Sequence, residues 1–251
     1  MIIAEHLRKT FPGKGKEKQP VVAVDDVGFT AHDGQITGLL GPNGAGKTTT
    51  LRMLYTLMTP ETGRVLVDGV DVATDPDRVR RSLGVLPDAR GVYKRLSARE
   101  NIEYFGQLHG MPAPVIAAHI QKLAAALQME DFLDRRTEGF SQGQRTKTAI
   151  ARALIHDPKN VILDEPTNGL DVMTTRGLRT FLRDLRAEGR CVIFSSHIMQ
   201  EVAALCDRIV VIAKGRVAAQ GTPDELREAT GEQNLEDAFV KLIGSEEGLH
   251  A

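Results

Sequence analysis

The sequence contains no tryptophan, only two cysteines and few aromatic residues, which make up 4% of its 251 positions. Cys191 and Cys206 are too few for the disulfide framework of a small secreted domain, so we expect reduced thiols, with a single disulfide left open. No apolar run approaches the roughly 20 residues that a membrane-spanning helix needs. The first residues also lack the features of a signal peptide. These absences predict a cytosolic chain, unless a partner holds it at a membrane.

Neither sign of charge is in excess, since 32 basic residues stand beside 33 acidic ones and the formal net charge is -1. Such a balance gives no general attraction to nucleic acid or anionic lipid, and we predict no nucleic-acid partner. The length and the hydrophobic content of 41% suffice for one large α/β domain, with room for a subdomain.

A glycine-rich loop of the pattern G-x-x-x-x-G-K-[ST] carries the clearest chemistry. An apolar stretch from Gln35 to Leu40 predicts a buried strand before it, and leucines at helical spacing predict a helix after it, from Lys47 to Leu57. In this context the backbone N–H groups and the helix N-terminus bind phosphate. We predict that Lys47 reaches the β- and γ-phosphates of a nucleotide and that the Thr48 hydroxyl ligates Mg²⁺. The predicted phosphate-binding residues are Gly41, Pro42, Asn43, Gly44, Ala45, Gly46, Lys47, Thr48 and Thr49.

Phe11 is a candidate for the base of the nucleotide. It lies upstream of the phosphate loop and is followed by a polar loop from Pro12 to Pro20. An aromatic ring there can stack on adenine, or it can belong to the edge of the core. The sequence leaves both interpretations open.

Two carboxylates follow an apolar stretch, Val161–Leu163, that predicts a buried strand. We predict that Asp164 holds Mg²⁺ through a water and that Glu165 is the general base for the attacking water. A bare Asp-Glu pair usually marks a solvated turn, but the phosphate loop upstream favours the catalytic interpretation. His197 ends another apolar strand, where it is placed to contact the γ-phosphate, although a lone histidine is more often structural.

The middle of the chain predicts a helical insertion. Ser97 and Glu100 form the pattern of a capping box, and an Ala- and Leu-rich helix from Val115 to Met129 follows two prolines. We expect an α/β nucleotide-binding core with a β subdomain in residues 1–87 and 157–220, a helical subdomain in residues 88–156, and a helical tail in residues 221–251.

The ordered motifs resemble those of ABC-type ATPases. They are the phosphate loop, Phe140–Gln144, Leu163–Pro166, Gly169–Asp171 and His197, and they cover nearly the whole chain. The resemblance implies a P-loop NTPase of the ABC ATPase type: a mostly parallel core sheet, an N-terminal antiparallel β subdomain and a helical insertion. It also implies a head-to-tail homodimer with two ATP molecules sandwiched between the subunits. The residues that it adds to the nucleotide site are Ser141, Gly143, Gln144 and Asp171.

Two positions depart from the family pattern. The signature reads Phe-Ser-Gln-Gly-Gln in place of Leu-Ser-Gly-Gly-Gln, although Ser141 and Gly143 are kept. Asp88 occupies the place of a glutamine that contacts Mg²⁺ and the lytic water in the family. An aspartate can ligate Mg²⁺, but it is shorter and charged. We therefore predict Thr48, Asp88 and Asp164 as the metal site, with altered coupling to the helical insertion.

The stretches Gly84–Tyr93 and Leu235–Phe239 resemble the NatA-type branch, whose members serve ABC-2-type exporters. The resemblance implies a NatB-like permease as partner, a position on the inner face of the cell membrane and sodium extrusion. Drug and polysaccharide exporters share much of this pattern and stay alternatives. A soluble ABC ATPase without a transport role is the further alternative.

Overall fold

The computed structural model describes residues 1–13, 19–88 and 91–247, without the side chains of residues 245–247. Part of the polar loop from Pro12 to Pro20, two residues after Asp88 and the end of the predicted tail therefore lie outside the described residues. Cys191 and Cys206 are buried free thiols, as expected.

A six-stranded sheet forms the centre of the molecule, in the order β10-β9-β3-β8-β7-β6. All neighbouring pairs are parallel except β10 with β9. The inner strands are buried along their whole length and mostly apolar, as expected for a sheet covered on both faces. The strands are β3 (Ile36–Leu40), β6 (Leu83–Leu86), β7 (Asn160–Leu163), β8 (Cys191–Ser196), β9 (Arg208–Ala213) and β10 (Arg216–Gly221).

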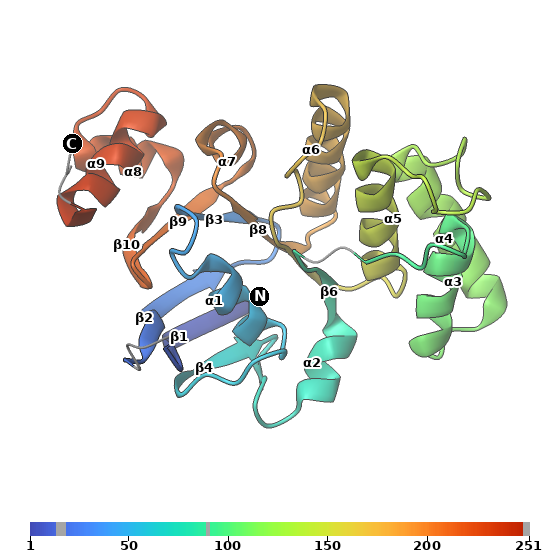
Figure 1. Cartoon of the computed structure of the whole chain (residues 1–251), viewed down its shortest axis with the longest axis horizontal. Helices are drawn as coiled ribbons and strands as arrows, with labels where there is room; N and C mark the ends of the chain where they lie inside the picture. The colour runs from blue at the N-terminus through green and yellow to red at the C-terminus, as the bar shows by residue number, and fades with distance from the viewer. Residues whose placement is uncertain (14–18, 89–90, 248–251) are drawn as a thin grey trace.

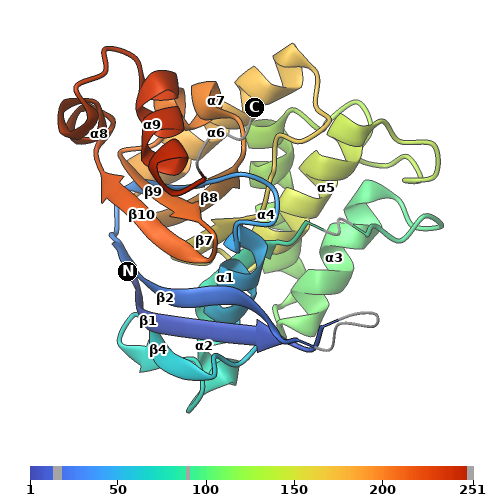
Figure 2. The same cartoon turned by 60° about the vertical axis from the view of Figure 1, so that its left-hand side comes forward.

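An antiparallel sheet built from the start of the chain packs beside this core, in the order β2-β1-β4-β5. Helix α1 (Lys47–Leu54) contacts three of its strands, and Figures 1 and 2 show the helix between the two sheets. The strands are β1 (Ile2–Phe11), β2 (Val21–Ala31), β4 (Thr62–Val67) and β5 (Val70–Asp71), and helix α2 (Pro76–Ser82) follows them.

The chain between β6 and β7 forms a helical lobe at the β6 end of the sheet (Figure 1). The lobe consists of α3 (Ala98–Leu108), α4 (Ala113–Leu127) and α5 (Gln142–Leu154). The capping box of Ser97 and Glu100 is present at the start of α3, as predicted. Because the lobe enters directly from β6 and returns directly to β7, its position is linked to the two strands that carry Asp88 and the acidic pair.

The remaining helices cover the sheet and its opposite end. Helices α6 (Val172–Ala187) and α7 (Met199–Leu205) follow β7 and β8, while α8 (Pro223–Thr230) and α9 (Leu235–Glu247) lie beside β10 (Figure 1). The structure confirms the predicted fold class of a mostly parallel core, an antiparallel N-terminal sheet and a helical insertion. Within the described residues no helix is long and apolar enough to cross a membrane.

The predicted bounds of some helices were wrong by two or three residues. Helix α1 ends at Leu54 rather than Leu57, whose side chain is 68% exposed. Helix α4 runs from Ala113 to Leu127 rather than from Val115 to Met129, and it ends where Gln128 adopts a left-handed conformation with φ +54°. Helix α6 begins at Val172, where the Asp171 side chain accepts a hydrogen bond from the Thr174 N–H and caps the helix.

Candidate functional site

The phosphate loop lies between the end of β3 and the start of α1, and its glycines are required by the geometry. A Cβ at Gly41 would lie 2.2 Å from the carbonyl oxygen of Ile212. Gly46 has φ +107°, and a Cβ there would lie 2.5 Å from the carbonyl oxygen of Ala23. The backbone conformation of the loop therefore requires glycine at these two positions.

This loop forms one wall of an open cavity of about 520 Å³. The opposite wall comes from residues that follow β6, β7 and β8, which all end at this edge of the sheet. Carboxyl ends of parallel strands are where open α/β sheets bind ligands. The lining residues are Ala23, Asn43, Gly44, Ala45, Gly46, Lys47, Thr48, Thr49, Asp88, Glu165, Asn168 and His197.

Lys47 lies folded back on the loop and is 5% exposed. Its ammonium group donates to the carbonyl oxygens of Gly41, at 2.7 Å, and Pro42, at 3.2 Å, and lies 3.5 Å from a carboxylate oxygen of Glu165. These contacts compensate for burial of the charge. They also keep the ammonium beside the cavity that the loop encloses.

Glu165 and His197 form a direct pair across the ends of β7 and β8. The Nδ1 atom of His197 lies 2.8 Å from Oε2 of Glu165, whose side chain is 12% exposed. Glu165 has φ +47°, which is uncommon for a residue with a side chain and is a conformation found at functional sites. The pairing places a carboxylate and an imidazole at the same side of the cavity.

Asp164 is fully buried just behind this pair. The Ser195 hydroxyl donates to Oδ1 of Asp164 at 2.6 Å and accepts the N–H of Glu165 at 2.8 Å. Burial raises the pKa of Asp164; the nearby carboxylates of Asp88 and Glu165 add to the rise, and the Ser195 hydrogen bond opposes it. The Oδ2 atom has no hydrogen-bond partner in the described part of the chain. A buried carboxylate oxygen without a partner is a site that a cation would satisfy.

The donors around the cavity fit a magnesium ion. Thr48, Asp88 and Asp164 supply hydroxyl and carboxylate oxygens, which are the ligands that Mg²⁺ prefers. No group of three or more His, Cys, Asp or Glu side chains could hold a metal alone among the residues described.

The comparison with family models finds one match, ABC transporter, over residues 24–168. The chain belongs to the ABC transporter family. Among curated relatives, the ABC transporter ATP-binding protein NatA of Bacillus subtilis (strain 168) is 44% identical over 228 residues, which are 90% of this chain and 93% of the relative. The doxorubicin resistance ATP-binding protein DrrA of Mycobacterium tuberculosis (strain CDC 1551 / Oshkosh) is 34% identical over 97% of this chain and 75% of its own length.

A solved structure described as the dimeric structure of MJ0796, a bacterial ABC transporter cassette, shares the fold with a TM-score of 0.80 and 25% identity. The match covers 88% of this chain and 98% of that one. The chain is therefore an ABC ATPase subunit, and proteins of this family bind ATP.

The remaining predicted residues of the ABC signature lie outside the cavity. Ser141 and Gln144 form a capping box at the start of α5, where each side chain bonds to the other residue's N–H. A Cβ at Gly143 would lie 3.2 Å from Thr174. Asp171 caps α6, as described above. Gly143 and Asp171 both lie against Thr174, so the start of α5 is next to the start of α6.

Some predicted residues lie apart from the cavity wall, and some wall residues were not predicted. Phe11 ends β1, where it pairs with Val21, and does not line the cavity; Gly41, Pro42 and Asp164 are also absent from its lining. The sequence motifs did not indicate Ala23, Asn168 or Ser195. An alanine on a strand and a serine inside an apolar strand carry no motif, whereas the position of Asn168, three residues after Glu165, was a usable signal.

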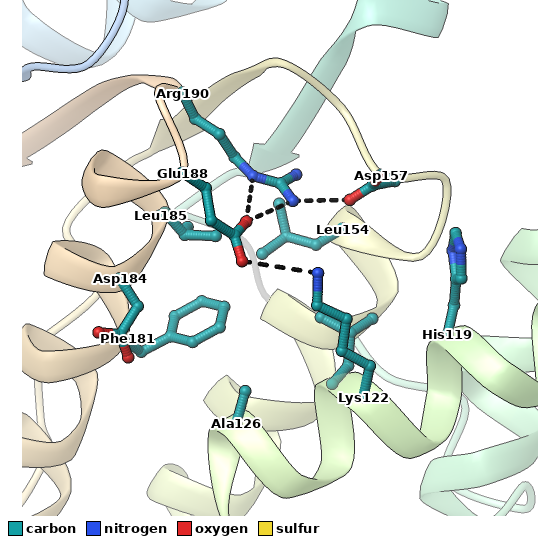
Figure 3. Close-up of a pocket in the computed structure, with 11 residues that line it drawn as sticks. His119, Lys122, Ala126, Leu154, Asp157, Phe181, Asp184, Leu185, Glu188 and Arg190 are labelled. Atoms are coloured by element: carbon teal, nitrogen blue, oxygen red, sulfur yellow. Dashed lines mark hydrogen bonds and ion pairs between the residues drawn. The ribbon is translucent and has the colours of Figure 1, made fainter.

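A second cavity, of about 330 Å³, lies between α4 and α6 (Figure 3). Four of its charged side chains pair with one another: Arg190 bonds to Asp157 at 2.6 Å and to Glu188 at 2.7 Å, and Lys122 lies 3.5 Å from Glu188. None of the predicted nucleotide or metal residues lines it. The two cavities are therefore separate sites.

Proposed function

We propose that this chain is the ATP-hydrolysing subunit of an ABC-2-type membrane exporter and that the 520 Å³ cavity is its nucleotide site. The observation that carries the proposal is the arrangement of Lys47, Glu165 and His197 around one cavity, behind a loop built to bind phosphate. Each of these side chains has the chemistry that one step of hydrolysis requires.

In this proposal the loop N–H groups and Lys47 bind the β- and γ-phosphates, which replace the carbonyl contacts of the ammonium group. Glu165 accepts the proton of the attacking water, and His197 contacts the γ-phosphate and orients the carboxylate of Glu165. Thr48, Asp88 and Asp164 would hold Mg²⁺. The ion would supply neutralising charge on the phosphate oxygens as the bond to the leaving group breaks.

The proposed active form is a head-to-tail homodimer. The start of α5 offers the N-terminus of a 13-residue helix, together with Ser141, Gly143 and Gln144, to the γ-phosphate of the partner subunit's nucleotide. Asp171 lies at the same surface. The dimeric state of a structural neighbour supports this assembly. We propose that residues 88–156 form the helical subdomain, which moves when the dimer assembles. We propose that residues 221–251 form a tail on the core.

The proposed partner is a NatB-like permease, which would hold the chain at the cytoplasmic face of the membrane. The similarity to NatA over 90% of the chain supports this branch, and we propose sodium ions as the cargo. The similarity to DrrA keeps a drug as the alternative cargo, since that relative is named for doxorubicin resistance. In both cases the cargo would pass through the permease and not through this chain.

Hydrolysis is tested with the Glu165→Gln variant, which keeps the size of the side chain but removes its basicity. We expect ATP affinity close to that of the wild type, a stable ATP-bound dimer and a loss of phosphate release. The matched control is Glu61→Gln, because Glu61 lies in the N-terminal part of the chain, away from the cavity. Rapid hydrolysis by Glu165→Gln would overturn the role given to Glu165.

The exporter assignment is tested by purifying tagged Glu165→Gln protein from membranes with ATP and Mg²⁺ and identifying co-purifying proteins by mass spectrometry. We expect a multi-span membrane protein at near-equal stoichiometry. Reconstitution of that pair in vesicles, followed by sodium flux measurements, then tests the cargo. If the tagged protein is recovered only with further copies of itself, with ribosomes or with DNA, a soluble ATPase without a transport role would be the better assignment.

A further inference from the structure

Glu201, in the first turn of α7, is a buried carboxylate that the proposed reaction does not use. Its side chain is 8% exposed, and it does not line the nucleotide cavity. Its Oε2 atom accepts hydrogen bonds from the hydroxyl of Thr167 and, at 3.3 Å, from the hydroxyl of Ser196. Its Oε1 atom lies 4.0 Å from Arg179 of α6. The carboxylate therefore contacts three separate segments of the chain.

Two of these segments carry the proposed catalytic pair. Thr167 lies two residues after Glu165, in the turn that follows β7, and Ser196 is the residue directly before His197 at the end of β8. The Ser196 hydroxyl also accepts the N–H of Ile198, which fixes the turn on the other side of His197. Glu201 thus joins the two turns behind the Glu165–His197 contact, in addition to the connection that Ser195 makes with Asp164 and Glu165.

The turn after β7 needs such support because of its backbone. Glu165 is in the left-handed region, with φ +47°, and strained backbone persists only where the surroundings hold it. The N–H of Glu165 is held by Ser195 and its carbonyl oxygen accepts the N–H of Asn168 at 3.2 Å, while the Thr167 side chain is held by Glu201. Loss of the Thr167 contact would free this turn to relax, and the carboxylate of Glu165 would move with it.

Stability alone does not account for the carboxylate. A buried charge is costly unless it is closely paired, and its distance to Arg179 is at the limit of an ion pair. The hydrogen bonds from two hydroxyl groups are the closer contacts, and both lead to the catalytic turns. Hydrogen bonds to a charged acceptor are stronger and more directional than those between neutral groups.

We propose that Glu201 is a positioning residue for ATP hydrolysis, which holds the turns of Glu165 and His197 in register through Thr167 and Ser196. This inference rests on the proposed roles of Glu165 and His197. Since Glu201 is away from the cavity wall, it acts on the rate of hydrolysis and leaves nucleotide binding largely unchanged.

The test uses the purified full chain and compares Thr167→Val, which removes the hydroxyl at nearly constant volume, with Thr167→Ser, which keeps it. We expect Thr167→Val to lower kcat about tenfold, equivalent to about 1.4 kcal/mol in the barrier, with KM and the equilibrium affinity for ATP within about twofold. Thr167→Ser should keep most of the activity. Glu201→Ala should lower kcat at least as much as Thr167→Val does. The double variant should show little further decrease in kcat, because both changes break the same contact.

Thr230→Val is the matched control, since the Thr230 hydroxyl is also buried and donates to a backbone carbonyl of α8. It should leave kcat unchanged at a similar cost in thermal stability. Wild-type kcat in Thr167→Val and Glu201→Ala would overturn the inference, as would a parallel loss of ATP binding or an equal loss in Thr230→Val. If Glu165→Gln hydrolyses ATP like the wild type, the proposed function and this inference both fail. If only Glu165→Gln is inactive, this inference alone fails.

Discussion

His156, which follows α5, is predicted to make the fold sensitive to acid. Its ring stacks on that of His109 with centroids 3.8 Å apart and planes inclined by 10°. Its Nε2 lies 3.0 Å from the carbonyl oxygen of Leu83, so Nε2 carries the proton and donates it. Its Nδ1 atom is buried and has no hydrogen-bond partner within the described segments. Protonation would therefore bury an N–H without an acceptor.

Burial, with a contribution from His109, lowers the pKa of His156 from 6.5 to about 4. Between these two values the unfolded chain binds a proton at this position and the folded chain does not, so stability falls as pH decreases. Above about pH 6.5 the ring is neutral in both states and does not lower the free energy of unfolding. Below about pH 4 it is protonated in both states, and the loss of free energy of unfolding has reached its full size. The linkage between protonation and folding lowers the free energy of unfolding by about 2 kcal/mol at about pH 5 relative to about pH 7.5.

The measurement compares urea unfolding of the wild type and of His156→Gln at these two pH values. The variant keeps a donor for the Leu83 carbonyl but cannot be protonated. Its free energy of unfolding should therefore fall by about 2 kcal/mol less between the two pH values than that of the wild type. His32→Gln is the control because His32 is exposed. NMR titration of the His156 ring gives the pKa directly. A value near 6.5, or equal pH dependence in wild type and His156→Gln, would refute the reasoning.

Three predictions concern the nucleotide site. Gly41→Ala should weaken ATP binding at least tenfold in a fluorescence titration, because the added Cβ would lie 2.2 Å from the Ile212 carbonyl oxygen and displace the loop. Ser195→Ala should lower kcat about tenfold with little effect on ATP affinity, since the hydroxyl orients Asp164 and the following N–H; unchanged kcat would show that this contact is dispensable. Asp88→Gln should alter steady-state turnover and leave ATP affinity nearly intact, and a large loss of binding would count against its assignment to metal coupling.

The sequence was sufficient for features that are local in the chain. The phosphate loop was predictable because a strand, a glycine turn and a helix follow one another within about 20 residues. The capping box of Ser97 and Glu100 was predictable for the same reason. In each case the residues that interact are near neighbours, so their spacing carries the signal.

Contacts between distant segments were not predictable in this way. Ser195 acts on Asp164 only because β7 and β8 are adjacent, and serine at the end of an apolar strand has no distinctive pattern. Ala23 reaches the cavity because β2 passes under Gly46, where the two backbones approach too closely for a side chain. The burial of Glu201 could not be read from the periodicity of a seven-residue helix.

Strand register explains why the site residues meet and why the helical lobe is coupled to them. Leu163 of β7 pairs with Leu86 of β6 on one side and with Phe194 of β8 on the other, so β6 and β7 end at one level while β8 continues two residues further, to Ser196. The N–H of Asp164 donates to the carbonyl of Leu86 at 2.8 Å, which extends this pairing to the acidic residues. Asp88 leaves β6 two residues later and leads into the lobe. We therefore expect a movement of the lobe that pulls on β6 to shift Asp88 relative to Asp164.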